Sequence, residues 1–337
     1  MSTSRRAEVL AALRAAAGGT VSGEALAARL GVSRVAIAKH VRHLREAGYE
    51  IASVPGSGYR LVFAPDALAV DDVASRVTSP RVHRISGGDV TGSTNDDAKK
   101  LAKTDVPEIT VVIASRQTAG RGRLGRAWES PEGGVYVSFV LRPPLPVHAL
   151  TALPLAVGIG VAQGLERLGV DVGLKWPNDL VLAGSDVAGG DSADSVRSGG
   201  KLAGVLLEMA AEADRAQWVV VGMGVNVRRP SAGGEPAGAA YLDDTVPGVR
   251  LPDVAAAVVD GVAAAYERFL EGGFGALRAE YDHRHVLTGR HVSVAGAAGE
   301  RIAEGRVEGV DDMGRLLMAT PHGTAAVSAG DVTLRNP

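Results

Sequence analysis

The sequence predicts a multidomain α/β protein in which a helical N-terminal module precedes a mixed α+β body and a small C-terminal β domain. The 337 residues suffice for two or three domains of ordinary size. Hydrophobic residues make up 46% of the chain and charged residues 22%, which is the balance of a globular protein. Helical spacing of apolar residues prevails in residues 1–63, and short apolar segments between glycine-containing turns prevail after residue 289.

Composition excludes several classes of site and location. The chain has no cysteine, which rules out disulfides, thiolate metal sites and a cysteine nucleophile, and fits a cytoplasmic protein. The opening segment MSTSRRAEVL carries charges where a signal peptide needs apolar residues. The longest uncharged run, residues 143–165, contains four prolines, so we expect no membrane span and no membrane partner.

Residues 1–63 predict three helices followed by a hairpin. Ser22 and Ser33 can cap the second and third helices, and Gly31 follows the second. The third helix has an apolar stripe at i, i+4 and i+7, formed by Ile37, Val41 and Leu44. Two short strands, residues 49–51 and 59–61, flank the turn-rich segment Pro-Gly-Ser-Gly.

This pattern is typical of a winged helix-turn-helix, whose third helix enters the major groove of DNA. The segment carries nine Lys/Arg against four acidic residues, a net charge of +5, whereas the remaining chain carries −7. The alternative is a small helical interaction module with a solvated charged face, but the basic excess favours DNA. The candidate DNA-binding residues are Ser33, Arg34, Lys39, His40 and Arg60.

The remaining chain divides into a connector, a body and a β domain. Residues 64–82 form the expected connector, residues 83–285 the body and residues 286–337 the C-terminal domain. Two Gly/Ser/Ala-rich stretches of the body, residues 183–200 and 231–240, should be surface loops. Five short apolar segments of the C-terminal domain predict a small β-barrel: residues 291–295, 302–310, 316–319, 325–327 and 332–334.

A GxGxxG pattern at residues 120–125 does not indicate a dinucleotide-binding fold. That fold requires a helix next and an acidic residue about 20 positions on. Here a second strand follows at residues 135–141, and no acidic residue occurs between Glu132 and Glu166. A glycine-rich loop with Arg121, Arg123 and Arg126 remains, which is either an anion-binding loop or a mobile basic surface loop.

Four further segments have both a structural and a functional interpretation. KWPND at 175–179 is a hairpin turn in isolation. Lys201, at the start of an apolar strand, is an edge residue or a charge aimed at a reacting centre. Gly222 and Gly224 within a strand indicate a bulge or close approach by a ligand. Residues 92–95 precede a helix predicted over 96–103 and are an N-cap or a ligand-binding helix N-terminus.

Together these segments resemble the biotin protein ligase family. The matching motifs are GSTN (92–95), SRQTAGRGRLGRAW (115–128), KWPND (175–179), GKLAGVLLE (200–208) and GMGVN (222–226), in the same order and spacing. The DNA-binding module and the small C-terminal domain are similar to those of its bifunctional ligase/repressor members. The resemblance implies a biotin/lipoate-ligase-type central domain on a mixed, largely antiparallel sheet, and an SH3-like C-terminal barrel.

The resemblance also implies a reaction and partners. ATP, with Mg²⁺, activates biotin to biotinyl-5′-AMP, and the biotinyl group passes to one lysine of the biotin carboxyl carrier protein of acetyl-CoA carboxylase or a related carboxylase. Biotinyl-5′-AMP would serve as corepressor, and a homodimer would bind operator DNA. Alternatives are a lipoate or octanoyl ligase of the same fold, a biotin-sensing transcription factor without ligase activity, and a winged helix that merely supports the ligase.

Two anionic reactants repel each other, so activation needs positive charge between them. Lys201 is the candidate for this role, Arg123 would help to enclose the adenylate, and Asp179 is a candidate Mg²⁺ ligand and a weaker candidate for assisting the acceptor lysine. The resemblance implies that biotin is bound by Ser93, Thr94, Asn95, Gln117, Arg121, Gly122, Arg123 and Lys201. It implies that ATP and the adenylate are bound by Arg121, Arg123, Arg126, Trp128, Asn178, Asp179 and Asn226.

Overall fold

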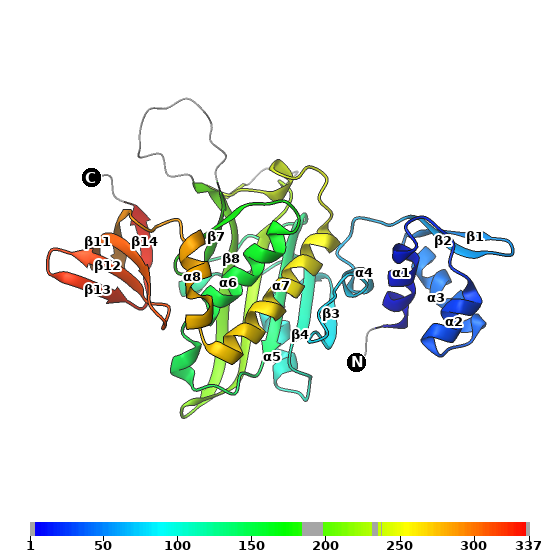
Figure 1. Ribbon diagram of the computed structural model, residues 1–337, viewed down its shortest axis with the longest axis horizontal. Helices are drawn as coiled ribbons and strands as arrows, with labels where there is room; N and C mark the ends of the chain where they lie inside the picture. Colours follow the sequence, from blue (N-terminus) through cyan, green and yellow to red (C-terminus); the bar gives the residue numbers. More distant parts are fainter. Residues whose placement is uncertain (1–3, 184–197, 231–234, 237, 335–337) are drawn as a thin grey trace.

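The computed structural model describes residues 4–183, 198–230, 235–236 and 238–334. It shows three parts in a row along the long axis of the molecule (Figure 1): an N-terminal module, a central α/β domain and a C-terminal β-sheet. The central domain lies between the other two. The predicted multidomain fold is therefore confirmed, with the N-terminal module and the C-terminal sheet at opposite ends.

The N-terminal module is a helix-turn-helix with a β-hairpin wing. Ser22 Oγ accepts the backbone N–H of Glu24 at 3.2 Å, and Ser33 Oγ accepts that of Ala36 at 3.1 Å, so both predicted caps are confirmed. Gly31, with φ of 63°, ends the second helix in the left-handed conformation that glycine favours. The elements are α1 Arg5–Ala15, α2 Gly23–Leu30, α3 Arg34–Glu46, β1 Glu50–Val54 and β2 Gly58–Phe63.

A buried carboxylate fixes this module to the connector. Asp72 of α4 (Val70–Ala74) is fully buried, and it contacts Arg14 of α1 at 2.5 Å and Arg76 at 2.9 Å. The Tyr49 hydroxyl donates to Asp72 at 3.0 Å, and burial, reinforced by this carboxylate, raises the pKa of Tyr49. Arg76 also pairs with Asp253 of the central domain, so one cluster joins the module, the connector and the central domain.

The central domain is built on one seven-stranded mixed sheet. Its strand order is β3-β4-β5-β9-β8-β7-β6, with β3 parallel to β4 and every other pair antiparallel. Since β4 and β5 flank the glycine-rich loop and run antiparallel, the rejection of a dinucleotide-binding fold is confirmed. The strands are β3 Arg84–Thr91, β4 Thr110–Gln117, β5 Gly134–Leu141, β6 Val172–Lys175, β7 Asp179–Ala183, β8 Ser198–Glu212 and β9 Arg215–Asn226.

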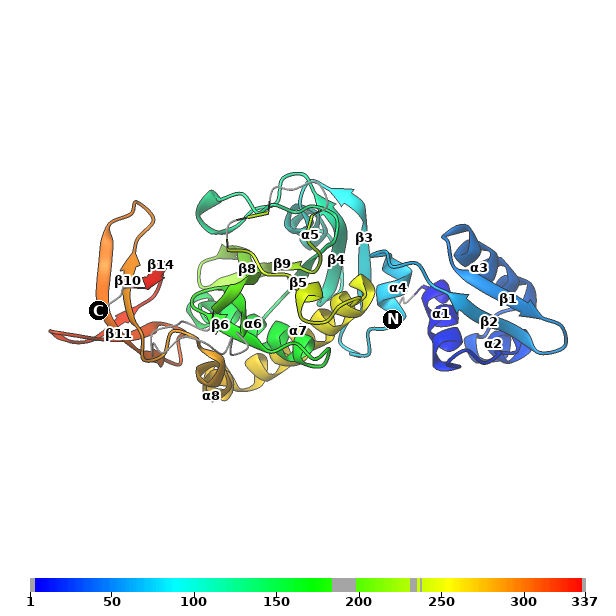
Figure 2. The same ribbon diagram turned by 90° about the horizontal axis from the view of Figure 1, so that it is seen from above.

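Helices cover both faces of this sheet (Figure 2). On one face lie α6 (Leu153–Glu166), α7 (Leu251–Gly272) and α8 (Gly275–Arg284), and on the other lies α5 (Thr94–Ala102). Glycines let α6 and α7 approach closely, because a Cβ atom on Gly261 would lie 2.1 Å from the Gly160 oxygen. Short 3₁₀ helices occupy Arg123–Gly125, Val147–Leu150 and Leu242–Asp244.

One helical segment, Val147–Glu166, is long and apolar enough to cross a membrane by length and composition alone. However, 67% of its most apolar window is buried inside the protein, where α6 packs against α7 and the sheet. Core helices of globular proteins have the same character, because a helix that is apolar all round is buried by its neighbours.

The C-terminal domain is an antiparallel sheet of five strands in the order β13-β12-β11-β10-β14. All five predicted segments are strands. Among the described residues the strands β13 and β14 are edges with no pairing between them, so closure into an SH3-like barrel stays a prediction. The strands are β10 His291–Ala295, β11 Arg301–Val310, β12 Leu316–Thr320, β13 Gly323–Val327 and β14 Asp331–Leu334.

Two predicted boundaries are wrong. Ala183 ends β7 and residues 198–200 begin β8, so the first predicted loop is shorter than 183–200. The described residues of the second predicted loop, 231–240, belong to no helix or strand, and Lys201 ties this loop to β8: its backbone N–H donates to the Gly238 carbonyl at 2.6 Å and its carbonyl accepts from Ala240 at 2.9 Å. Residues 184–197, 231–234 and 237 lie outside the described part. The helix predicted over 96–103 spans Thr94–Ala102.

Replacement of Asp72 by alanine should destabilise the junction. It leaves the partly buried Arg14 without a carboxylate and Arg76 with only Asp253, and breaking a buried ion pair typically costs about 3–5 kcal/mol. Urea unfolding followed by circular dichroism measures this loss. The control is Asp71→Ala, because Asp71 pairs with the half-exposed Arg6 and should contribute less than about 1 kcal/mol. Equal effects of the two variants would contradict the assigned role of Asp72.

Candidate functional site

A cavity of about 490 Å³ lies where the N-terminus of α5, the glycine-rich loop, the KWPND turn and the C-terminal strand β14 meet. Its size is that of a pocket for a small-molecule ligand. The structure therefore brings together residues from all five sequence motifs of the body. All of the expected biotin- and ATP-binding residues except Asn226 line it: Ser93, Thr94, Asn95, Gln117, Arg121, Gly122, Arg123, Arg126, Trp128, Asn178, Asp179 and Lys201.

The first turn of α5 forms a buried polar floor. Thr94 donates its backbone N–H and its hydroxyl to Gln117 Oε1, at 2.8 and 3.0 Å. The hydroxyl of Ser138 lies 2.8 Å from Thr94 Oγ1 and 2.7 Å from Asn95 Oδ1. Ser93 is the N-cap residue, but its side chain makes no cap bond and remains available to a ligand. This floor offers donors and acceptors of fixed direction to a polar ligand group.

Two glycines of β9 allow side chains of the protein to lie against the sheet. A Cβ atom on Gly222 would lie 1.9 Å from Asn95 Oδ1, and one on Gly224 would lie 2.3 Å from Trp128 Nε1. The close approach predicted from these glycines is therefore real, but the groups that approach are Asn95 and Trp128. Larger residues in β9 would displace both side chains from the cavity.

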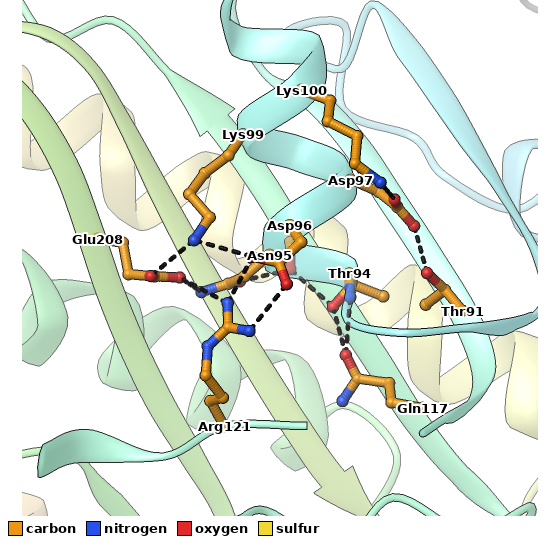
Figure 3. Close-up of polar contacts among 11 residues, drawn as sticks. Thr91, Thr94, Asn95, Asp96, Asp97, Lys99, Lys100, Gln117, Arg121 and Glu208 are labelled. Atoms are coloured by element: carbon orange, nitrogen blue, oxygen red, sulfur yellow. Dashed lines mark hydrogen bonds and ion pairs between the residues drawn. The ribbon is translucent and has the colours of Figure 1, made fainter. Parts of the chain in front are cut away.

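Arg121 is held by carboxylates on the sheet side of the loop (Figure 3). Its guanidinium contacts both oxygens of Asp96, at 2.6 and 2.8 Å, and lies 3.6 Å from Glu208. Lys99 bridges the same two carboxylates at 2.9 Å each. The hydrogen bonds from Arg121 are the main reason why the pKa of Asp96 lies far below its usual value. A ligand anion would have to compete with Asp96 for Arg121, so the residue serves as a loop anchor here.

Lys201 and Asp179 form an ion pair beside Trp128. Lys201 Nζ lies 2.7 Å from Asp179 Oδ1 and 5.0 Å from the centre of the Trp128 ring. The pair lacks hydrogen-bond geometry, so the buried Oδ1 of Asp179 accepts no hydrogen bond. Asn226 donates to the Lys201 backbone carbonyl at 3.1 Å and does not line the cavity. It therefore positions the strand that carries Lys201.

The C-terminal sheet supplies part of the wall, a contribution that the sequence did not reveal. Arg126 of the loop pairs with Asp331 of β14, and Arg123 donates to the Gly330 carbonyl at 3.4 Å. Arg123 also donates to Asn178 Oδ1 at 3.2 Å, which joins the loop to the KWPND turn. No local signal marks Asp331, because its partner lies about two hundred residues earlier in the chain.

The KWPND segment is a hairpin and a cavity wall at once. In the antiparallel ladder of β6 and β7, Lys175 lies opposite Asp179 on either side of the turn, which confirms the hairpin interpretation. Trp176 is buried and donates from Nε1 to the Gly314 carbonyl at 2.9 Å, so the turn is fixed to the C-terminal domain. Asn178 donates to the Val205 carbonyl at 2.9 Å, which presents its oxygen to Arg123.

The described residues contain no group of three or more His, Asp or Glu side chains that could hold a metal ion. Asp179 is the one expected ligand, with a buried oxygen that accepts no hydrogen bond. This fits Mg²⁺ that is bound mainly by substrate phosphates, because such an ion usually takes only one or two protein carboxylates.

The predicted DNA-binding residues do not share one environment. Arg34, Lys39 and Arg60 are exposed, on α3 and on the wing. Ser33 uses its hydroxyl as the cap of α3. His40 lies partly buried with an unpartnered Nδ1, and burial, then the neighbouring His43, lowers its pKa. His40 is therefore the one predicted residue that lies off the exposed surface of the helix.

Three segments match models of known protein families. Residues 87–226 match the biotin/lipoate A/B protein ligase family, residues 5–60 an HTH domain, and residues 287–335 the biotin protein ligase C terminal domain. The chain is 31% identical over 323 residues to the bifunctional ligase/repressor BirA of Bacillus subtilis (strain 168), covering 93% of this chain and 94% of that protein.

Two further relatives support the match. The biotin--[acetyl-CoA-carboxylase] ligase of Mycobacterium tuberculosis is 33% identical over 253 residues, covering 72% of this chain and 85% of that protein. Among solved structures, the biotin protein ligase from Aquifex aeolicus in complex with biotin and ATP is similar with a TM-score of 0.60. It has 28% sequence identity, and the match covers 77% of this chain and 100% of that one.

Replacement of Asp331 by asparagine should loosen the glycine-rich loop. The variant removes the anionic partner of Arg126, and an exposed ion pair contributes up to about 1 kcal/mol, equivalent to about fivefold in the population of a detached loop. Tryptic cleavage after the loop arginines, followed by mass spectrometry, measures this change. Glu304→Gln, which breaks an exposed pair with Arg301 in the same sheet, serves as control. An unchanged cleavage rate in the Asp331 variant would rule out this attachment.

Proposed function

Because the chain belongs to the biotin protein ligase family, we propose that it is an ATP-dependent biotin–[acetyl-CoA-carboxylase] ligase and a biotin-responsive repressor. The observation that carries the proposal is the single cavity in which a polar floor at α5 adjoins the cations Arg123 and Lys201. The HTH domain in front of this ligase domain supports the second activity.

Activation joins two anions. A carboxylate oxygen of biotin attacks the α-phosphorus of ATP, the bond from that phosphorus to the bridging oxygen breaks, and pyrophosphate leaves with the electron pair. Biotinyl-5′-AMP remains. Negative charge builds on the α-phosphoryl oxygens, so fixed cations lower the barrier. Lys201 supplies this charge from β8 and Arg123 supplies it from the loop.

The two ends of the cavity suit the two substrates. The donors and acceptors of Ser93, Thr94, Asn95 and Gln117 suit the polar ring system of biotin, with Gly122 of the loop above them. The Trp128 ring suits stacking on adenine. Asn178 and Arg126, which lie near Arg123 in the cavity wall, are the further candidates for binding the phosphates. Arg121 instead holds the glycine-rich loop, and Asn226 holds β8.

In the transfer step, the neutral amine of the acceptor lysine attacks the carbonyl carbon of the mixed anhydride. The carbon–oxygen bond to AMP breaks, AMP leaves as the phosphate anion, and the amine loses one proton. Asp179 is the proposed acceptor of this proton, and its carboxylate already lies beside a lysine ammonium group, Lys201. The acceptor lysine belongs to the carboxyl carrier protein.

Asp179 is also the proposed protein ligand of Mg²⁺. When bound, the ion would neutralise phosphate charge and orient the leaving pyrophosphate. The two proposed roles of Asp179 belong to different half-reactions, since the phosphate charge would be neutralised during activation and the proton is released during transfer.

Repression places further requirements on the chain. Paired operator half-sites require a two-fold dimer, so we propose a homodimer with biotinyl-5′-AMP as corepressor. The glycine-rich loop links ligand and dimer in this proposal, because it closes over the adenylate and orders on binding. The proposed location is the cytoplasm, where ATP and the carrier protein are available.

The direct test is incubation of the chain with ATP, Mg²⁺, biotin and a carrier domain, followed by intact-mass measurement of the carrier. One added biotinyl group on one lysine is expected. Lipoate in place of biotin tests the lipoate-ligase alternative, and biotin-dependent exchange between ATP and pyrophosphate separates activation from transfer. A chain that binds biotin without either reaction would be a sensor and not a ligase.

Replacement of Lys201 by alanine should lower the rate of adenylate formation by about a hundredfold to a thousandfold. The variant removes a cation from the reacting centre and leaves Asp179 as an unpaired anion beside the phosphates. ATP–pyrophosphate exchange measures the rate. Lys100→Ala, which removes an exposed partner of Asp97, is the control and should retain full activity. A Lys201 variant with normal exchange would refute the assignment.

Replacement of Arg123 by glycine should release the adenylate early. The side chain bridges the loop, the KWPND turn and the C-terminal sheet, so its loss opens the cavity on the side of the mixed anhydride. Free adenylate acylates exposed lysines, and biotinylation of an added bystander protein should rise, as measured with labelled streptavidin. Arg301→Ala, on the exposed surface of the C-terminal sheet, should leave target selectivity unchanged. Equal selectivity in both variants would contradict retention by Arg123.

A further inference from the structure

The outer face of α3 carries an exposed apolar side chain among cations. Val35 is 79% exposed, the highest value among the large exposed hydrophobic residues of the described chain. Ala38, Lys39 and Arg42 are also exposed. These four positions follow the spacing i, i+3, i+4 and i+7, so they form one continuous stripe along the helix. We name Val35, Ala38, Lys39 and Arg42 the outer stripe.

The orientation of the outer stripe is fixed by the opposite face. Ile37, Val41 and Leu44 are buried in the core of the module, with exposures of 0–2%. The Ser33 cap and the left-handed Gly31 fix the start of α3. Figure 2 shows α3 and the β1–β2 hairpin at the end of the molecule remote from the central sheet. The stripe therefore projects from a rigid helix at a free end of the protein.

The charges of the outer stripe are poorly neutralised. Within the described part of the chain, no carboxylate lies at ion-pair distance from Lys39 or Arg34, and the Arg42–Glu46 contact is long, at 3.8 Å between two exposed side chains. Val35 contributes little to folding, because an exposed β-branched residue has low helix propensity and this one is not part of the core. An exposed valine beside free cations suits a ligand that is anionic and also carries a methyl group.

We propose that Val35 reads a thymine in the operator by contact with its C5-methyl group in the major groove. Thymine is the only base that presents a methyl group there, and the N-terminal residues of a recognition helix contact base edges. Lys39 and Arg42, one turn and two turns further on, bind phosphate or guanine on the same side. This inference rests on the proposed DNA-binding function and assigns the base that the first turn of α3 recognises.

The test uses duplexes enriched from a random-sequence pool by the full chain in the presence of biotin and ATP. Each thymine of an enriched half-site is replaced in turn by deoxyuridine, which lacks only the methyl group, and Kd is measured by fluorescence anisotropy. Deoxyuridine at one position should raise the Kd of the wild type about fourfold, which is the effect of losing one buried methyl group. Val35→Ala should weaken binding similarly and become insensitive to deoxyuridine at that position.

Two variants complete the test. Val62→Ala removes an exposed valine from the wing and should keep the deoxyuridine effect, whereas Val35→Thr retains one methyl group and should keep part of it. Unchanged circular dichroism and thermal unfolding of each variant verify that the N-terminal module is folded. If the Val35 variants respond to deoxyuridine as the wild type does, or if no thymine matters, the inference is overturned while DNA binding stands. If no duplex is enriched, the DNA-binding function itself fails.

Discussion

The cavity depends on how the glycine-rich loop is held from both sides. Arg121 is fixed by Asp96 and Glu208 of the central domain, and Arg126 is fixed by Asp331 of the C-terminal sheet. Arg123 lies between these two attachments and faces the KWPND turn. Within the loop, the backbone N–H of Gly122 donates to the Arg126 carbonyl at 2.8 Å, so the loop closes on itself between the two attachments. The C-terminal domain is therefore part of the wall of the site, together with α5 and the KWPND turn.

Local sequence patterns predicted the elements well, and the reason is physical. Helix caps, glycine stops and alternating apolar residues act within a few positions of one another, so Ser22, Ser33 and the five C-terminal strands could be read directly. The sequence did not predict which residues distant in the chain contact one another. The carboxylates that engage Arg121 and Arg126, and the role of Asn226 behind Lys201, depend on strand order. Strand order also explains why a glycine-rich segment became the start of β8.

Polar contacts continue from the site toward the N-terminal module. Asn226 ends β9, and two residues later Arg228 donates its backbone N–H to the Gly133 carbonyl at 2.9 Å and pairs through its side chain with Asp66 of the connector. From there the chain reaches the cluster around Asp72, which is bonded to both α1 and Arg76. These contacts join the end of β9 to the connector, and the connector to α1.

The pairing of Lys201 with Asp179 has a consequence for selectivity. Because Lys201 already has a counterion, an arriving anion gains at this position only the difference between two partners. A ligand that also fills the polar floor and covers Trp128 compensates for the displaced carboxylate. The site thus selects among anions because a ligand must replace Asp179 as the partner of Lys201, and charge alone does not compensate for that loss.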